Sequence, residues 1–334
     1  MSEQALTTEQ LRFLAEAAGA APSLHNSQPW LLRPAPDSLG MDVYTDPSRA
    51  VPLTDPDGRA LHISVGAALF NLRVAGLRLG RDPEVRLLPD STEPGPAATV
   101  RLSRPAPASP PFGRDLFEAV GQRHSSRRPY TNRDIPEALF GDLLAAARDE
   151  GATLSLLEEA GVRRVLALTH EAERRTGSDL ARTAETRAWL RLDEPPANDG
   201  IPASALGPQD HDARVPVRNF TGRPSPTDTS QRFEALPQLA TLTTHGDLPT
   251  DWLRTGQAME RVWLLATVHG LRLSVLHQAV EWPDTRWGLR DPAEGPGHVQ
   301  LVLRLGYGPP GPATPRRPVD EILDLSDHRP TVGP

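Results

Sequence analysis

The 334-residue sequence has no cysteine, and all 36 of its basic residues are arginine because it contains no lysine either. Without cysteine there is no disulfide, no thiolate nucleophile and no cysteine-based zinc or iron–sulfur site. Without lysine there is no Schiff-base residue, which excludes the usual attachment of pyridoxal phosphate. Arginine side chains and backbone N–H groups are therefore the groups that can hold a bound anion. A coding bias towards Arg, Ala, Pro and Gly also explains the missing lysine without any function.

The chain also lacks a long apolar run and an excess of basic charge. No stretch reaches the roughly 20 apolar residues that cross a bilayer, and residues 1–10 are polar and acidic, so we expect a cytoplasmic protein. The formal net charge of −7 at pH 7 argues against nucleic acid or a membrane surface as a partner, because both attract basic faces. The 10 histidines show no metal-ligand spacing, so we expect no metal site.

Hydrophobic periodicity predicts an α+β protein whose chain begins again about a third of the way along. Residues 105–112 are rich in proline and read as a linker, so we predict a first half at residues 1–104 and a second half at residues 113–330. Helices are predicted at residues 7–18, 59–80, 162–190 and 253–270, and strands at residues 30–33, 41–45, 85–88, 99–102, 271–276 and 299–305.

Two internal repeats support this division. The pattern at Glu9–Ala18 recurs 128 residues later at Glu137–Ala146, and that at Gly66–Gly80 recurs 190 residues later at Gly256–Gly270. The shifts differ by 190 − 128 = 62 residues, so the second half carries about that much extra chain. We place it at about residues 192–233, called the insertion below, which form either a functional lid or a disordered segment. Ala- and Leu-rich helices also resemble one another by chance.

The loop from Ala21 to Trp30 is the first candidate functional segment. Its two prolines fix the backbone, and its short polar side chains can bind a planar heterocycle or nearby backbone groups. It lies between a predicted helix and a predicted strand, where polar groups can converge. A helix-end turn held by Asx hydrogen bonds is the alternative.

The second candidate segment runs from Arg123 to Tyr130. Arg123, Ser125 and Arg127 alternate, so in an extended segment their side chains share one face, which suits the grip of a terminal phosphate. A solvated basic turn is the alternative. The second arginine pair at residues 316–317, in a chain of negative net charge, favours the anion site.

These segments resemble the FMN-dependent nitroreductase family. Arg-His-Ser-Ser-Arg-x-x-Tyr beginning at Arg123, followed by a Pro-Glu-x-Leu helix, resembles the arm that binds the flavin phosphate in that family. Ala-Pro-Ser-x-x-Asn-x-Gln-Pro-Trp ending at Trp30 resembles the loop that lies against the flavin across the dimer interface. Here the first half has the loop but no arm, whereas the second half has the arm but residues 149–152 in place of the loop.

This split arrangement is similar to the Acg-like group of nitroreductase relatives, whose further segments resemble residues 47–49, 55–59 and 315–318. The resemblance implies tandem nitroreductase-like halves that form a pseudo-dimer, each a small sheet flanked by helices, with one FMN between them. It implies a monomer, with a higher oligomer left open. It also implies a lid over the flavin, which suits the insertion.

By the same resemblance the FMN-binding residues can be assigned. The arm would hold the phosphate and ribityl chain, the loop would lie near the isoalloxazine ring, and the segment after the long helix would approach flavin N5, although it lacks the family's glycine. No catalytic residue is required of the protein, because the flavin performs the two-electron chemistry. The assigned residues are Arg123, Ser125, Arg127, Arg316 and Arg317 at the phosphate end, Pro22, Ser23, Leu24, Asn26 and Gln28 in the loop, and Leu276, His277 and Gln278 near N5.

The implied function is that of an oxidoreductase. NAD(P)H would transiently donate electrons to FMN, and a small acceptor of nitroaromatic or quinone type would then take them. A protein that stores FMN beneath a lid with little turnover is the alternative. A tailoring oxidase that acts on one specific metabolite is a third.

Overall fold

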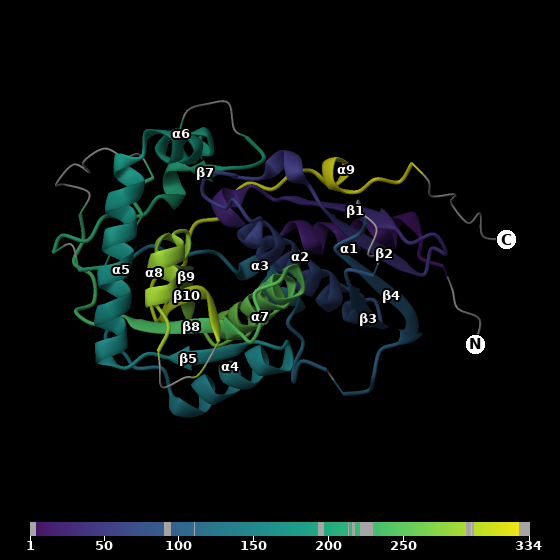
Figure 1. The fold of residues 1–334 in the computed structure, drawn as a ribbon. Helices are drawn as coiled ribbons and strands as arrows, with labels where there is room; N and C mark the ends of the chain where they lie inside the picture. The colour runs from purple at the N-terminus through teal and green to yellow at the C-terminus, as the bar shows by residue number, and fades with distance from the viewer. Residues whose placement is uncertain are drawn as a thin grey trace.

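The computed structural model describes residues 5–89, 95–109, 111–192, 197–212, 214–215, 218–220, 230–291, 295 and 297–326. Each half of the chain contributes a four-stranded antiparallel sheet, with helices α2 and α7 between the two sheets (Figure 1). The strand orders are β1-β2-β4-β3 and β5-β8-β10-β9, so strands that precede and follow the long helix of each half take the same places. The fold is therefore α+β with two similar halves, as predicted.

The first half follows the predicted pattern closely. Helix α1 begins after Thr7, whose side chain accepts a hydrogen bond from the Gln10 N–H while the Gln10 side chain accepts one from the Thr7 N–H. This capping box explains why the helix starts at that residue. The elements are α1 (Thr8–Gly19), β1 (Trp30–Pro34), β2 (Gly40–Thr45), α2 (Arg59–Arg78), β3 (Arg81–Leu87) and β4 (Ala98–Pro105).

The second half has more elements, and its last segment returns to the first half. Leu323 pairs with Leu32 of β1 in a parallel bridge, which places the segment before it beside the loop after α1. The elements are α3 (Phe117–Gln122), α4 (Glu137–Asp149), β5 (Thr153–Leu156), α5 (Glu159–Ser178), α6 (Leu180–Ala188), β6 (Leu190–Arg191), β7 (Ile201–Pro202), β8 (Gln238–Thr244), α7 (Pro249–Val268), β9 (Arg272–Val275), α8 (Pro283–Gly288), β10 (His298–Gly306) and α9 (Val319–Ile322).

The closest helix contact joins α2 to α7 through the two glycines of the longer repeat. A Cβ added to Gly66 would lie 2.2 Å from the Leu253 carbonyl oxygen, and one added to Gly256 would lie 2.0 Å from the Ile63 carbonyl oxygen. Because 66 + 190 = 256 and 63 + 190 = 253, the contact is reciprocal, like that across a two-fold axis. The backbones approach so closely that only glycine fits at either position.

Helix α2 departs from one sequence expectation. It is 20 residues long and apolar enough to cross a membrane by length and composition, although no such run was expected. However, 78% of its apolar 18-residue stretch is buried inside the protein. Contacts with α1 and α7 explain its apolar circumference, because α2 is covered on several sides.

The helix expected at residues 162–190 is wrong in one respect, because it breaks at Asp179 into α5 and α6. Asp179 has extended backbone angles, and its carboxylate accepts hydrogen bonds from the N–H groups of Ala181 and Arg182, both at 3.0 Å. Its side chain therefore acts as the N-cap of a new helix.

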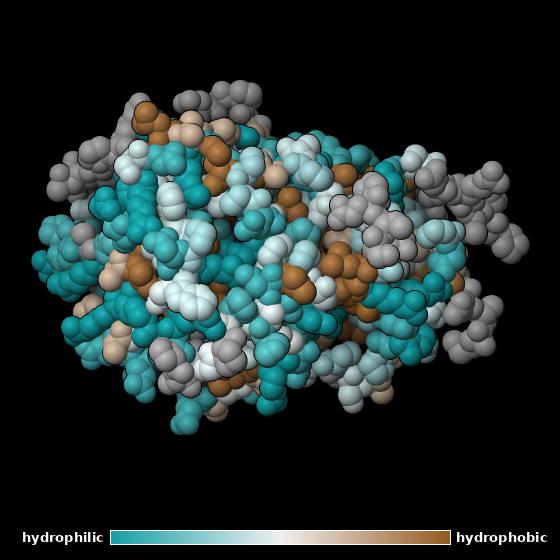
Figure 2. Space-filling view, in the orientation of Figure 1, coloured by the Kyte–Doolittle hydropathy of each residue, from teal (hydrophilic) through white to brown (hydrophobic). Residues whose placement is uncertain are grey.

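The described part of the insertion is ordered structure rather than a structureless segment. Ile201 in β7 pairs with Leu190 in β6, and it packs with Ala205 and Phe220 in a small apolar cluster. The side of the molecule drawn in Figure 2 is largely hydrophilic, with its apolar residues in small separate groups.

Candidate functional site

A two-lobed cavity lies between the halves, against the loop after α1, the segment after α3, and helices α2 and α7. The space open to the centres of water molecules is about 130 Å³ in the main lobe and about 60 Å³ in the small lobe. The two lobes adjoin because they share wall residues, namely Pro22, Ser23, His25, Ser125, Arg127 and Ile201.

The two lobes differ in chemistry. Apolar side chains dominate the main lobe, including Ile63 of α2, Met259 and Trp263 of α7, and Phe220 of the insertion. The small lobe is polar and contains Arg123, His124, Thr314 and Arg316. The cavity thus combines an apolar space with a cationic end.

The loop after α1 enters the main lobe through an unusual backbone turn. His25, Asn26 and Gln28 have φ angles of 54°, 55° and 53°, a left-handed region that costs a non-glycine residue about 1 kcal/mol or more. The turn is held internally, because the Gln28 N–H donates to the Ser23 hydroxyl at 2.9 Å. It places Pro22, Ser23 and Leu24 in the wall of the main lobe and Asn26 in the wall of the small lobe.

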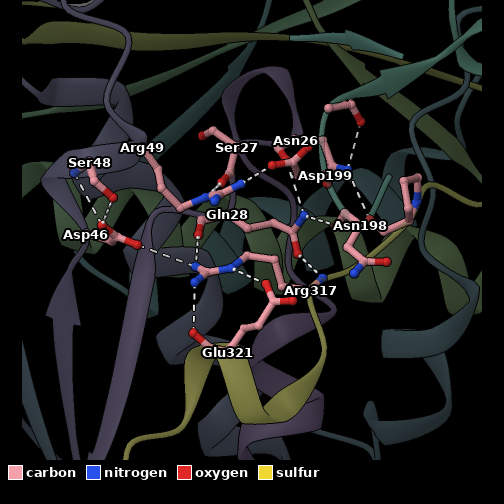
Figure 3. Close-up of polar contacts among 12 residues, drawn as sticks. Asn26, Ser27, Gln28, Asp46, Ser48, Arg49, Asn198, Asp199, Arg317 and Glu321 are labelled. Carbon is pink, nitrogen blue, oxygen red and sulfur yellow. Dashed lines mark hydrogen bonds and ion pairs between the residues drawn. The ribbon is translucent and has the colours of Figure 1, made fainter. Parts of the chain in front are cut away.

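Gln28 and Arg317 lie in a polar cluster (Figure 3). Neither residue lines either lobe of the cavity. The Gln28 amide nitrogen donates to the Asn198 carbonyl at 2.9 Å, and its amide oxygen accepts from the Arg317 N–H at 2.8 Å. The Arg317 guanidinium forms an ion pair with Asp46 at 3.5 Å. Nearby, Arg49 binds Asp199 of the insertion. The structure therefore places two of the assigned flavin residues in a clasp that joins the loop, the insertion and the C-terminal segment.

Arg123 and Arg316 converge in the small lobe. Both guanidinium groups donate to the Ala20 carbonyl oxygen, at 3.1 Å and 3.0 Å, beyond the C-terminal end of α1. The Arg123 guanidinium also lies 4.8 Å from the centroid of the Trp263 ring. Burial, and then the charge of Arg123, lowers the pKa of Arg316 to about 9. Arg123 is buried and Arg316 partly buried, and two positive charges side by side in such a place are stabilised by an anion.

The described residues supply one carboxylate to this pair. Glu260 of α7 is fully buried, and one of its oxygens lies 3.2 Å from Arg123 Nε. Burial raises the pKa of Glu260 to about 7, although Arg123, Arg316 and the amide of Asn71 oppose that rise. The small lobe therefore keeps an excess of positive charge.

Arg127 provides a further positive charge where the two lobes adjoin. Its guanidinium donates to the Ala205 carbonyl of the insertion at 2.6 Å and lies 5.1 Å from the centroid of the Phe220 ring. Burial, and then the charge of Arg218, lowers the pKa of Arg127 to about 10. Arg123, Ser125 and Arg127 all line the small lobe, so the alternation seen in the sequence does bring the three side chains together.

Leu276, His277 and Gln278 also line the main lobe, directly after β9. The Nδ1 atom of His277 lies 2.9 Å from a Glu281 carboxylate oxygen, and Arg218 of the insertion donates to that oxygen. Burial alone would raise the pKa of Glu281, but Arg218 and His277 lower it to about 2. The insertion is thus held to the cavity wall by a buried ion pair.

His25 completes this contact from the first half. Arg218 Nη1 lies 3.1 Å from His25 Nε2, and the imidazole meets the Phe220 ring edge-on with 6.1 Å between centroids. Burial, and then the charge of Arg218, lowers the pKa of His25 to about 3. The ring is therefore neutral near pH 7 and accepts the arginine hydrogen bond at Nε2.

Sequence reasoning missed several wall residues. Met259 and Trp263 lie within an apolar helix pattern, and nothing in that pattern separates a cavity wall from the core. Phe220 and Arg218 lie in the insertion, where apolar residues such as Phe220 and the spacing of Arg214 and Arg218 predict a segment anchored to the protein without assigning either residue to a cavity wall. His25 lies inside the loop motif, and this position is the sequence feature that could have placed it in the cavity wall.

Comparison with known proteins supports one family. A Mycobacterium tuberculosis protein named "Putative NAD(P)H nitroreductase" is 32% identical over 327 residues, which cover 95% of this chain and 91% of that protein. Another from the same organism, named "Putative NAD(P)H nitroreductase acg", is 27% identical over 339 residues, covering 98% of this chain and 100% of that protein. A crystal structure of a "putative nitroreductase" from Anabaena variabilis aligns with a TM-score of 0.41 and 10% identity, covering 90% of this chain and 88% of that one.

No protein-family model matches the chain. The similarity to the first relative nevertheless spans nearly the whole chain at 32% identity. The loop and the arm come from opposite halves and meet at one cavity, as the split motifs required. The chain belongs to the nitroreductase superfamily, in its Acg-like group.

Proposed function

We propose that the cavity binds FMN and that the protein is an NAD(P)H-dependent oxidoreductase whose flavin passes electrons to a small acceptor of nitroaromatic or quinone type. The observation that carries the proposal is the pairing of an apolar main lobe with a small lobe that holds Arg123 and Arg316. A ligand with a flat apolar ring at one end and a phosphate at the other matches this division. The relatives named above supply the reaction class.

The residues present fit such a ligand. Arg123, Ser125, Arg127 and Arg316 would hold the phosphate and the ribityl chain, because their polar atoms border the small lobe and their charges exceed that of Glu260. The ring would lie in the main lobe, against the loop after α1 and the segment after β9. Gln28 and Arg317 would act indirectly, by fixing that loop. The wall residues of the main lobe are Pro22, Ser23, Leu24, Leu276, His277 and Gln278.

When bound, FMN would supply two-electron chemistry, which leaves binding, orientation and exclusion of water to the protein. The apolar wall from Ile63, Met259 and Trp263 would exclude water from around a ring bound in the main lobe. The Arg218–Glu281 pair fixes the side of the cavity nearest the insertion. No described side chain is required to transfer a proton.

A low-turnover FMN store is the second candidate, and the insertion favours it. Ile201, Val215, Arg218 and Phe220 of the insertion all line the main lobe. A lid of this kind restricts the approach of NAD(P)H and of an acceptor. In either role we propose a cytoplasmic, single-site monomer that arose by internal duplication, with halves at residues 1–104 and 113–330 joined by residues 105–112.

Rapid mixing of the FMN-loaded protein with NADH or NADPH tests the two roles. Loss of the oxidised flavin absorbance within the time of catalytic turnover supports the oxidoreductase, whereas persistence of that absorbance supports the store. Purified protein that neither contains FMN nor takes it up would contradict both. An acceptor screen with one nitroaromatic compound and one quinone then identifies the acceptor class.

A further inference from the structure

Glu260 occupies an unusual place beside the small lobe, against Arg123 of its wall. It is a carboxylate on the central helix α7, fully buried, with Arg123 as an ion-pair partner at 3.2 Å. Neither of its oxygens has a hydrogen bond of ordinary geometry among the described residues. A buried carboxylate held this loosely is costly in its charged form, so its proton affinity responds strongly to neighbouring charge.

The charges around Glu260 can be counted element by element. Arg123 faces it from the end of α3 and Arg316 from the C-terminal segment, while α2 presents the neutral amide of Asn71. The wall of the lobe also contains His124, whose pKa is lowered by burial, Arg123 and Arg316, so it is neutral at pH 8. Arg127 lines the same lobe and adds one more positive charge, so the lobe carries about +2 when Glu260 is ionised and about +3 when it is protonated.

We propose that Glu260 is the internal counter-anion of the small lobe, and that a phosphate monoester dianion entering the lobe displaces its charge by driving one proton onto it. Protonation removes the negative charge of Glu260 that a ligand of −2 would otherwise face. The proton comes from solvent, and no covalent bond other than its O–H bond is formed. The inference rests on the proposed function only in the choice of FMN as the physiological ligand.

The raised pKa of Glu260 also predicts the direction in which the stability of the unliganded protein changes with pH. The pKa of Glu260 is about 7 in the folded state, against an ordinary value of 4.5. Between these values the folded state binds more protons than the unfolded state, so stability falls as pH rises through this window. A phosphate dianion raises the proton affinity of Glu260 further, because like charges oppose its ionisation.

Calorimetric titration at pH 8, in two buffers that differ in ionisation enthalpy, measures the protons taken up on binding. At this pH the FMN phosphate is already a dianion, since its second pKa is about 6. We expect FMN to take up more than about half a proton per site and riboflavin to take up none. Between pH 7.5 and 8.5 we expect FMN affinity to fall several-fold, and Glu260→Gln to abolish both the uptake and this fall.

Two further variants locate the proton. Glu150→Gln is the matched control, because Glu150 is also a buried carboxylate beside α7 and lies between Arg73 and Arg261, outside the cavity. It should leave the uptake unchanged, as should His124→Gln. Uptake that survives in Glu260→Gln, or disappears in His124→Gln, would overturn the assignment.

The wild-type titration tests the role of Glu260 even where a variant fails to fold. FMN binding without proton uptake would overturn the role of Glu260 while leaving the proposed function intact. If FMN does not bind at any pH, the proposed function fails, and inorganic phosphate then serves as the probe. Phosphate binding with uptake would support the Glu260 inference by itself, and phosphate binding without uptake would overturn it.

Discussion

The cavity wall around Trp263 and the corresponding position around Arg73 are related by the pseudo-two-fold arrangement but have opposite chemistry. In the cavity, the Arg123 guanidinium lies 4.8 Å from the centroid of the Trp263 ring. On α2, 190 residues earlier, Arg73 replaces the tryptophan, and Phe112 from the linker region lies 5.2 Å away. On α7 the helix supplies the aromatic ring and another segment supplies the arginine, whereas on α2 the helix supplies the arginine and another segment supplies the ring. Phe112 also packs on Phe70 with 4.9 Å between ring centroids.

The two positions also differ in the carboxylate that the chain supplies to the arginines. Glu150 follows α4 at the position where Pro22 follows α1, since 22 + 128 = 150. It accepts hydrogen bonds from Arg73 at 2.5 Å and Arg261 at 2.9 Å. One position thus presents unbalanced arginines to a cavity, whereas the other is filled by the chain's own carboxylate and aromatic ring. This difference explains why one ligand per chain is expected.

Among the substitutions that test this comparison, Glu150→Ala should have the largest effect, which is on the free energy of unfolding. It removes the carboxylate that Arg73 and Arg261 share, but Arg261 keeps its ion pair with Asp149 at 2.8 Å, so the free energy of unfolding should fall by about 3 kcal/mol, the lower end for a broken buried pair. Urea unfolding measures the change, with the exposed Glu118→Ala as control. A loss below about 1 kcal/mol would show that Glu150 does not fill this position electrostatically.

Phe112→Ala tests the aromatic part of the filled position. Removing a buried ring should lower the free energy of unfolding by about 3 kcal/mol, and Phe112→Leu should cost less than about 1.5 kcal/mol. The ratio of FMN to protein, measured after release of the flavin, should stay at one per chain because the arm is still missing there. A ratio near two would contradict the single-site proposal.

Arg316→Ala should weaken FMN binding without weakening riboflavin binding. Loss of a partly buried, charge-assisted contact to the phosphate should cost about 2 kcal/mol, or roughly 30-fold in affinity. Arg317→Ala is the matched control, because its side chain lies in the clasp and should affect both flavins equally. An equal loss for both ligands in Arg316→Ala would mean that the small lobe does not hold the phosphate.

Arg218→Gln should have the smallest effect of the four. Glu281 keeps its contact with His277, and Arg127 still binds Ala205, so the insertion stays largely in place. We expect FMN to exchange with free flavin at least about fivefold faster, a change of about 1 kcal/mol. Arg214→Gln, an exposed change four residues away, should leave the exchange rate unaltered. Equal rates for both variants would show that the insertion does not act as a lid.

The sequence by itself determined the repeated elements and the two ends of the cavity. Periodicity located α1, α2 and α7, because a helix that buries one or more faces must repeat its apolar residues every three or four positions. The alternation of Arg123, Ser125 and Arg127 was enough to bring three side chains to one lobe, since an extended segment fixes their common face.

Only the tertiary structure decided which side chains meet across the halves. Gln28 and Arg317 belong to recognisable motifs, yet their places in the clasp depend on contacts between segments nearly 300 residues apart, as their separation of 289 shows. Glu260 read as one more helix residue until the crossing of α2 and α7 buried it beside Arg123. Such burial is set by long-range packing, which leaves no local pattern in the chain.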